Sequence, residues 1–165
     1  MIGTLVDQEV FEELLKQKLP KISSHLKKYH LPLAVISTKW FLCMFLGALP
    51  TETTLRIWDL FFFHGSPIII MMALSVIKLY ELDLLKIGST EQFMNFTSVI
   101  GKLCFDADHL INIAFDTIGI IDIRHLNYIR VRYWSSTKDH LEVENKKRDI
   151  HFLERHTHCG YFLFL

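Results

Sequence analysis

The sequence predicts an all-α protein, and three observations lead to that fold class. No segment alternates apolar and polar residues with the period of two that marks a half-buried strand. Apolar residues recur three and four positions apart, in runs separated by proline, glycine and helix-capping residues. Half of the 165 residues are apolar and 13 are Phe, so a domain of this length can bury a sizeable core.

Two helices are expected before residue 31. Asp7 can cap the first helix, because a carboxylate accepts hydrogen bonds from the free amides of a first turn. The apolar residues of this helix share one face: Val10, Phe11, Leu14 and Leu15. Pro20 ends or bends it. A shorter helix follows and stops near His30, because the proline at position 32 disfavours helical geometry in the residue before it.

Two further helices are expected in the middle of the chain. Ser37 caps the helix that contains Trp40, and Thr51 caps the next one. The Thr51 helix is apolar on nearly all sides, so we expect it to lie at the centre of the fold. Arg56 and Asp59 lie three positions apart on it, where an internal ion pair or a cap on a neighbouring helix is expected rather than a partner-binding surface.

Residues 60–77 raise the question of a membrane span, since 18 positions pass without a Lys, Arg, Asp or Glu. Gly65, Ser66 and Pro67 interrupt this run. Ser66 can cap a new helix and Pro67 suits its first position. Two buried helices are therefore expected, with no membrane insertion.

Three more helices are expected in the remainder of the chain. Ser89 and Gln92 form a capping-box pattern before an apolar run. Either Asp106 or Asp108 caps the next helix, and the last one runs from about residue 122 to residue 135. The structured part is thus expected to span residues 1–135. Residues 136–165 are first highly charged and then apolar, and are expected to form a disordered or appended tail.

Composition excludes several classes of function. Lys plus Arg and Asp plus Glu both number 18, so bulk charge does not favour nucleic-acid binding. Cys43, Cys104 and Cys159 are odd in number and form no C-x-x-C pair, which excludes a disulfide framework and a zinc ribbon. A reducing, cytoplasmic setting follows. The amino terminus has no basic residue before its apolar ones, unlike a signal peptide.

No metal or cofactor site is expected. The cluster His151, His156, His158 and Cys159 does not have a recognised zinc spacing. The aromatic residues Trp40, Phe41, Phe45 and Trp58 have helical spacing and are expected in the core, not around a cofactor. Cys43 and Cys104 are expected to behave as small hydrophobic residues. The basic and aromatic residues near the end are expected to form a solvated helix face: Arg124, Tyr128, Arg130, Arg132, Tyr133, Trp134 and Lys138.

Several short motifs follow one another in the first half of the chain. They are D-Q-E-V-F at residues 7–11, H-L at 25–26, W-F-L-C-M-F at 40–45, L-P-T-E at 49–52 and L-R-I-W-D at 55–59, with a Gly six residues later. This order resembles the carboxy-terminal half of a TBC domain, the module of Rab GTPase-activating proteins. The resemblance is nearest to the branch of the growth-hormone-regulated TBC protein. It covers residues 1 to about 87 and fades towards 135.

The resemblance implies an all-helical, V-shaped fold that binds a Rab GTPase and inserts two catalytic side chains into its nucleotide site. An Arg from an I-x-x-D-x-x-R motif neutralises charge on the transferred phosphate, and a Gln from a Y-x-Q motif orients water. Neither motif occurs here: residues 113–119 have Gly119 where Arg is required, and residues 118–124 hold Asp122 one position out of register. No catalytic residue is assigned, and the chain is expected not to be an enzyme.

Two functions therefore remain. The first is a fragment of a Rab GTPase-activating protein, a regulator of small GTPases in vesicle trafficking that is inactive alone. The alternative is a non-catalytic helical protein-binding module or scaffold. A Rab is the expected partner, and it would place this cytoplasmic chain at the periphery of endomembranes. A start inside a family motif and an end in unrelated sequence together suggest a truncated isoform or an incomplete gene model. Apolar helix faces that normally pack on the other half of the TBC domain are then expected to be exposed and to cause self-association.

Overall fold

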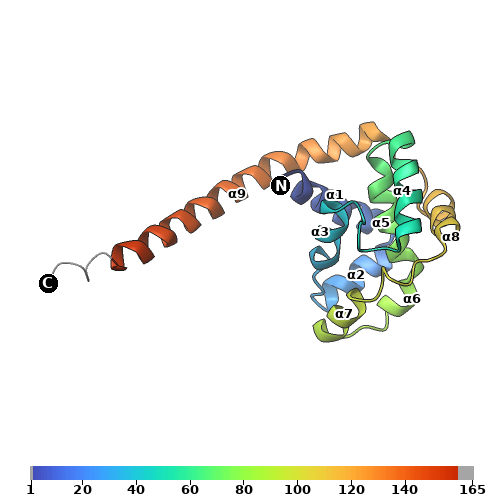
Figure 1. Ribbon diagram of the computed structural model, residues 1–165, viewed down its shortest axis with the longest axis horizontal. Coiled ribbons are helices and arrows are strands. Elements are labelled where there is room, and N and C mark those ends of the chain that lie inside the picture. The colour runs from blue at the N-terminus through green and yellow to red at the C-terminus, as the bar shows by residue number, and fades with distance from the viewer. Residues whose placement is uncertain (1, 160–165) are drawn as a thin grey trace.

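The computed structural model describes the backbone of residues 2–159 and the side chains of residues 2–143 and 146–148 (Figure 1). Its regular elements in this range are all helical, which confirms the all-α class. In chain order they are α1 (Ile2–Lys18), α2 (Pro20–Lys28), α3 (Ala34–Leu42), α4 (Thr51–His64), α5 (Pro67–Leu79), α6 (Glu81–Leu84), α7 (Thr90–Thr97), α8 (Ala107–Asn112), the π-helix η1 (Ile113–Ile118) and α9 (Ile123–Cys159).

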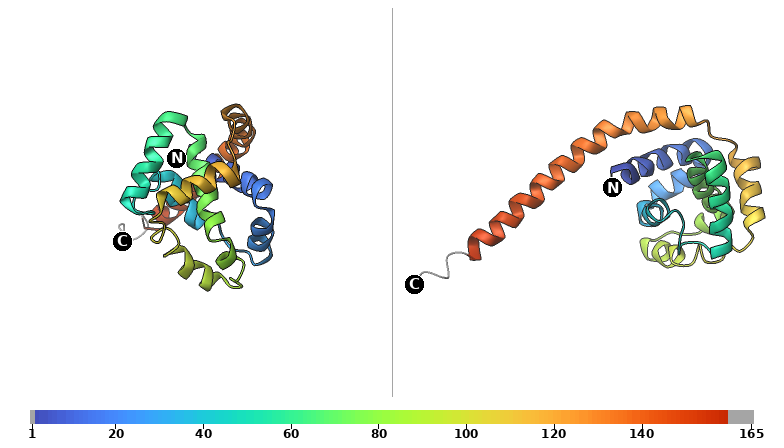
Figure 2. Two further views of the ribbon diagram at one scale, coloured as in Figure 1. Left: turned by 90° about the vertical axis from the view of Figure 1, so that its right-hand side faces the viewer. Right: turned by 45° about the horizontal axis from the view of Figure 1, so that its top comes forward.

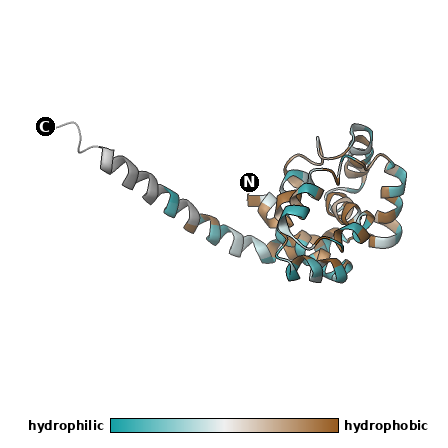
Figure 3. Ribbon diagram, turned by 90° about the horizontal axis from the view of Figure 1, so that it is seen from below, coloured by the Kyte–Doolittle hydropathy of each residue, from teal (hydrophilic) through white to brown (hydrophobic). Residues whose placement is uncertain are grey.

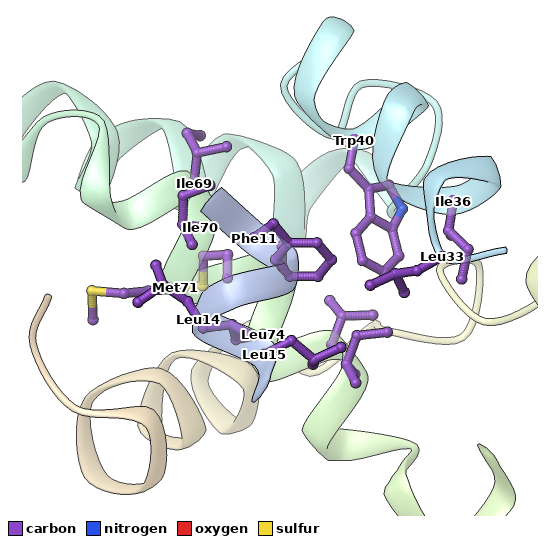
Figure 4. Close-up of a cluster of buried hydrophobic side chains, with 14 of the residues drawn as sticks. Phe11, Leu14, Leu15, Leu33, Ile36, Trp40, Ile69, Ile70, Met71 and Leu74 are labelled. Atoms are coloured by element: carbon purple, nitrogen blue, oxygen red, sulfur yellow. The ribbon is translucent and has the colours of Figure 1, made fainter. Parts of the chain in front are cut away.

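Helix α5 lies at the centre of the fold. Every residue from Pro67 to Ile77 is buried, and α1, α3, α4, α6, α8 and η1 all contact this helix. Figure 4 shows side chains of α1, of α3 and the residue before it, and of α5 meeting in one cluster. The expectation that the Thr51 helix is central is wrong. In α4 only Thr53, Thr54 and Ile57 are buried, because α5 covers a single face of it.

Helix α1 supplies the second layer of the core. Its apolar face is buried as expected at Val10, Phe11, Leu14 and Leu15. The Phe11 ring meets Phe41 edge-on, with the ring centroids 5.4 Å apart. Pro20 occupies the first position of α2, so it separates the two helices as expected. Asp7 is not a cap, because α1 already begins at Ile2.

The expected helix caps divide into two groups. The Ser89 hydroxyl accepts a hydrogen bond from the Gln92 amide at 3.3 Å, and the Asp106 carboxylate accepts one from the His109 amide at 2.8 Å, which confirms both caps. Ser37 and Ser66 do not cap. Ser37 is buried inside α3, and the Ser66 hydroxyl accepts a hydrogen bond from Arg130 instead. Thr51 begins α4 without a side-chain cap.

A tight turn between α3 and α4 depends on a close backbone approach. Phe45 has a φ of 66°, is fully buried and packs against Trp40, with the ring centroids 5.8 Å apart. The Trp58 indole donates a hydrogen bond to the Met44 carbonyl at 2.9 Å. Gly101 lies against this turn so closely that a Cβ there would be 2.0 Å from the Ala48 carbonyl oxygen. Only glycine fits this position.

Helix α9 first packs on the body and then leaves it (Figure 1). Leu126 and Ile129 are buried in its contact with α1. Asp122 accepts a hydrogen bond from the Arg124 amide at 2.9 Å, at the expected start of the helix. The expected end near Ser135 is wrong, since the helix continues to Cys159. No Gly or Pro occurs between residues 120 and 159 to stop it.

Residues 60–77 form the end of α4 and most of α5. The two helices are separated at Gly65, whose φ is 81°, and Pro67 begins α5. Burial of both helices was expected, but Phe62 and Phe63 at the end of α4 are exposed. Among the described helices, none combines the length and the apolar character that a membrane crossing requires.

We expect Gly101→Ala to lower the free energy of unfolding by about 2 kcal/mol or more, because the new methyl group would overlap the Ala48 carbonyl. Urea unfolding followed by circular dichroism measures this change. Gly3→Ala is the matched control, because it lies in α1 with nothing within 4 Å of the added Cβ. The control is expected to stabilise the protein by about 0.5–1 kcal/mol. Similar unfolding curves for the two variants would contradict the close approach.

We expect Asp7→Asn to loosen α9 from α1. Arg130 donates to Asp7 at 2.7 Å, and their side chains are only 25% and 27% exposed, so the loss of this ion pair is expected to cost about 1 kcal/mol. Asp139→Asn, on the exposed surface of α9, is the control. Hydrogen exchange of the amides of residues 123–135 should accelerate only in Asp7→Asn. Unchanged exchange would show that the Asp7–Arg130 pair does not hold α9 against α1.

Candidate functional site

The outward face of α4 exposes three large apolar side chains, Leu55, Phe62 and Phe63. We define the α4 outer face by its exposed side chains: Glu52, Leu55, Arg56, Asp59, Phe62 and Phe63. The side chains of Phe62 and Phe63 are 78% and 84% exposed. Exposed aromatic side chains are typical of protein-protein interfaces. This face is therefore a candidate partner-binding surface.

The α4 outer face was not predicted, although the sequence contains a feature that indicates it. Three consecutive Phe residues precede His64, and successive helical residues point about 100° apart. Three neighbours therefore cannot all face one core. The structure half-buries Phe61 and leaves Phe62 and Phe63 outside.

Arg56 binds across to another helix instead of to its own. Its guanidinium donates to the Asp108 carboxylate at 3.1 Å, in the first turn of α8. The expected internal pair with Asp59 is not formed. Arg56 does reach a neighbouring helix, but it binds the Asp108 side chain and does not cap the helix backbone as expected. Both partners are well exposed, so this ion pair contributes little to stability. Asp59 has no ion-pair partner among the described residues.

An apolar pocket of about 370 Å³ opens beside the end of α4. Its walls come from α4, α5, η1 and the start of α9, and they include His64, Met71, Phe115 and Ile120. The His64 and Phe115 rings lie 5.9 Å apart, and Ile120 is 77% exposed at the rim. The pocket can accept an apolar side chain of a partner.

The three arginines in the first turns of α9 are all paired with carboxylates. Arg124 pairs with Asp122, Arg130 with Asp7, and Arg132 with Glu13. Hydrogen bonds from the Arg124 amide and guanidinium hold the pKa of Asp122 below its usual value. The prediction of a solvated face is confirmed at Arg124 and Tyr128, which are exposed. It is wrong at Tyr133, which packs partly buried against the core, and at Arg130, which binds Asp7 of α1 and Ser66.

The segment nearest to the arginine motif forms η1 and the turn after it. Residues Ile113–Ile118 adopt the π-helix, and Gly119 ends it with a φ of 78°. Position 119 thus has no side chain and a backbone conformation that other residues rarely adopt. This segment cannot supply an arginine to a nucleotide site.

An open groove of about 910 Å³ runs between α1, α2 and the turn before α3, with Tyr133 of α9 at one side. Glu9, Glu12 and Glu13 lie along it, together with Lys16 and Lys27. Burial raises the pKa of Glu12, and the neighbouring Glu9 carboxylate raises it further, while Lys27 acts in the opposite direction. The groove brings charges of both signs together and resembles a surface for polar contacts more than a reaction centre.

The described cysteines differ in their surroundings. Cys104 is buried, as expected for a small hydrophobic residue, and its thiol lies 3.7 Å from the Tyr80 hydroxyl. Burial raises the pKa of Cys104, so the thiolate that nucleophilic chemistry needs is disfavoured. Cys43 is exposed directly after α3, so its thiol is not buried like that of Cys104.

The four aromatic residues that were expected in the core are buried or partly buried. Trp40 and Phe45 are buried, while Phe41 and Trp58 are partly buried. The H-L motif has a structural role: Leu26 is buried, and a ring nitrogen of His25 lies 2.7 Å from the Ile87 carbonyl oxygen. These residues join elements of the core to one another.

The His151, His156, His158 and Cys159 side chains lie outside the described residues. Among the side chains that are described, no group of three His, Cys, Asp or Glu could hold a metal ion. The absence of a metal site at the end of the chain stays a prediction.

Comparison with known proteins identifies the family of the first half. The model of the Rab-GTPase-TBC domain matches residues 1–85, about half of the chain. This segment contains α1 to α6 and thus both the central helix and the α4 outer face.

Relatives extend the similarity over nearly the whole chain. TBC1 domain family member 2A of Homo sapiens is 29% identical over 156 residues, which are 94% of this chain and 17% of that protein. Growth hormone-regulated TBC protein 1 of Xenopus laevis is 41% identical over 86 residues, which are 52% of this chain and 25% of that protein. The chain thus spans a quarter or less of the length of these relatives.

A crystal structure of the Chlamydomonas flagellar RabGAP TBC domain has a similar fold. The TM-score is 0.64 at 31% sequence identity, and the match covers 68% of this chain and 39% of the solved chain. These matches confirm the resemblance seen in the motifs. They contradict the expectation that the chain is no enzyme, because the matched family consists of Rab GTPase activators, which are enzymes. The chain belongs to the Rab-GTPase-TBC domain family.

Proposed function

We propose that this chain is the carboxy-terminal half of a Rab GTPase-activating domain and that it regulates a Rab GTPase in vesicle trafficking. The family match over residues 1–85 is the observation that supports this proposal. A Rab is the proposed partner, and its membrane anchor would bring this cytoplasmic chain to the periphery of endomembranes. We place the domain in residues 1–135 and treat residues 136–165 as an appended segment.

The catalytic side chains of such a domain are proposed to come from outside these 165 residues. Neither I-x-x-D-x-x-R nor Y-x-Q occurs in these residues. The arginines that follow residues 113–119, the segment most similar to the arginine motif, form ion pairs with carboxylates: Arg124, Arg130 and Arg132. In this proposal the chain supplies the α4 outer face and the supporting core. A polypeptide that carries both motifs supplies the charge that stabilises the transition state.

Single-turnover GTP hydrolysis by a panel of Rabs tests this proposal. The chain alone is expected to give no acceleration, because an arginine supplied in trans contributes on the order of 10³ to 10⁵ in rate. Adding the amino-terminal half of a TBC domain, with both motifs, is expected to restore acceleration by at least one Rab. The matched control is the same half with its motif Arg replaced by Ala.

Two other outcomes would count against the proposal. Acceleration by the chain alone would place a catalytic group within these residues, and alanine replacement of Arg124, Arg130 and Arg132 in turn would locate it. Binding of a Rab without acceleration of GTP hydrolysis, both by the chain alone and with the amino-terminal half added, would favour the alternative, a helical protein-binding module.

We also propose that the chain self-associates through its exposed apolar side chains. Phe62→Ser combined with Phe63→Ser is expected to reduce the apparent mass in sedimentation without loss of stability, because both side chains are mostly exposed. Phe11→Ser is the contrasting control: it removes a fully buried ring and should unfold the protein. A concentration-independent monomer before any substitution would contradict self-association.

A further inference from the structure

The positive charges of this neutral chain are unevenly distributed. Residues 14–51 contain six Lys, no Arg and no Asp or Glu, although the whole sequence has equal numbers of acidic and basic residues. Five of the six lysines lie at the end of α1 and on α2, and all five are exposed: Lys16, Lys18, Lys21, Lys27 and Lys28. We call this surface the lysine edge. The end of α1 and α2 lie along one outer edge of the body (Figure 2, left).

Helix α2 separates its two kinds of residue by face. Ile22, Ser23 and Leu26 are buried against the core. Lys21 and Lys28 are seven positions apart, and this spacing places them on the same outward side of the helix. On α2 the lysine edge is therefore the exposed, charged side of a helix whose opposite side is buried in the core.

Three carboxylates, those of Glu9, Glu12 and Glu13, share the groove with Lys16 and Lys27, and none lies along it with Lys18, Lys21 or Lys28. Glu13 is paired with Arg132. Glu12 interacts with Lys27, which acts to lower its pKa. None of the five lysines forms an ion pair with a described residue, and the Lys28 ammonium lies over the Tyr29 ring, 5.0 Å from its centroid.

The helix dipole does not explain the positions of all five lysines of the lysine edge. Lysines in a last turn are favoured by the helix dipole, which accounts for Lys16, Lys18, Lys27 and Lys28. Lys21 lies in the first turn of α2, where the same dipole disfavours a positive charge. A binding role for the edge accounts for this position as well.

We propose that the lysine edge binds the anionic headgroups of a phospholipid bilayer. Lysine clusters on a helix attract such a surface through long-range charge, and no shaped pocket is required. Protein interfaces are depleted in Lys, and directional recognition of nucleic-acid phosphates favours Arg, which is absent from residues 14–51. This contact orients the body on a membrane and needs no Rab.

Flotation of the full 165-residue chain with vesicles tests the proposal without any GTPase. Binding to phosphatidylserine-rich vesicles is expected, with weaker binding at high ionic strength and none to neutral phosphatidylcholine vesicles. A triple variant, Lys18→Gln with Lys21→Gln and Lys28→Gln, is expected to reduce the partition coefficient by about a hundredfold, since each lysine contributes about fivefold.

The matched control removes three exposed lysines from elsewhere: Lys86→Gln with Lys102→Gln and Lys138→Gln. This control has the same net charge as the triple variant. An equal loss of vesicle binding in both variants would show that only the overall charge matters and would overturn the proposal. Equal binding to anionic and neutral vesicles would also overturn it. Binding to polyglutamate that is lost in the triple variant, with no vesicle binding, would assign the edge to an acidic protein instead. Far-UV circular dichroism confirms that both variants fold.

Discussion

Complete burial of α5 is the constraint on which the rest of this structure depends. A helix that is apolar on all sides must be covered on all sides, and Pro67 to Ile77 are enclosed accordingly. The covering helices come from both ends of the chain, α1 from the start and η1 from a position more than a hundred residues later. Each covering helix needs only one apolar face, so their other faces are free to carry charge or to bind partners.

The ion pairs of α9 show how a polar helix is fixed to this body. Leu126 and Ile129 provide the apolar contact, and Arg130 adds hydrogen bonds to Asp7 and to Ser66. The described part of α9 beyond the body is mainly hydrophilic in Figure 3. Continuous helix there follows from side-chain pairs such as Lys138 with Glu142, 3.9 Å apart, and from the lack of Gly and Pro.

The two candidate binding surfaces have opposite chemistry. The α4 outer face presents Phe62 and Phe63 at its carboxy-terminal end, and such exposed aromatic side chains suit a protein interface. The lysine edge presents flexible cations above a buried helix face, which suits a diffuse anionic surface. Both lie within the 85 residues that match the Rab-GTPase-TBC domain, so one domain offers separate surfaces for two kinds of contact.

The sequence by itself determined the all-α class, the buried face of α1, the break at Gly65 and the cap at Ser89, and it narrowed the next cap to Asp106 or Asp108. Each depends on residues close together in the chain, where spacing and local hydrogen bonding decide the outcome. Only the tertiary structure decided that α5 rather than α4 is central, that Arg56 binds Asp108, and that Asp7 binds Arg130. These outcomes join residues 52 and 123 positions apart, and which faces meet depends on how all the helices pack together.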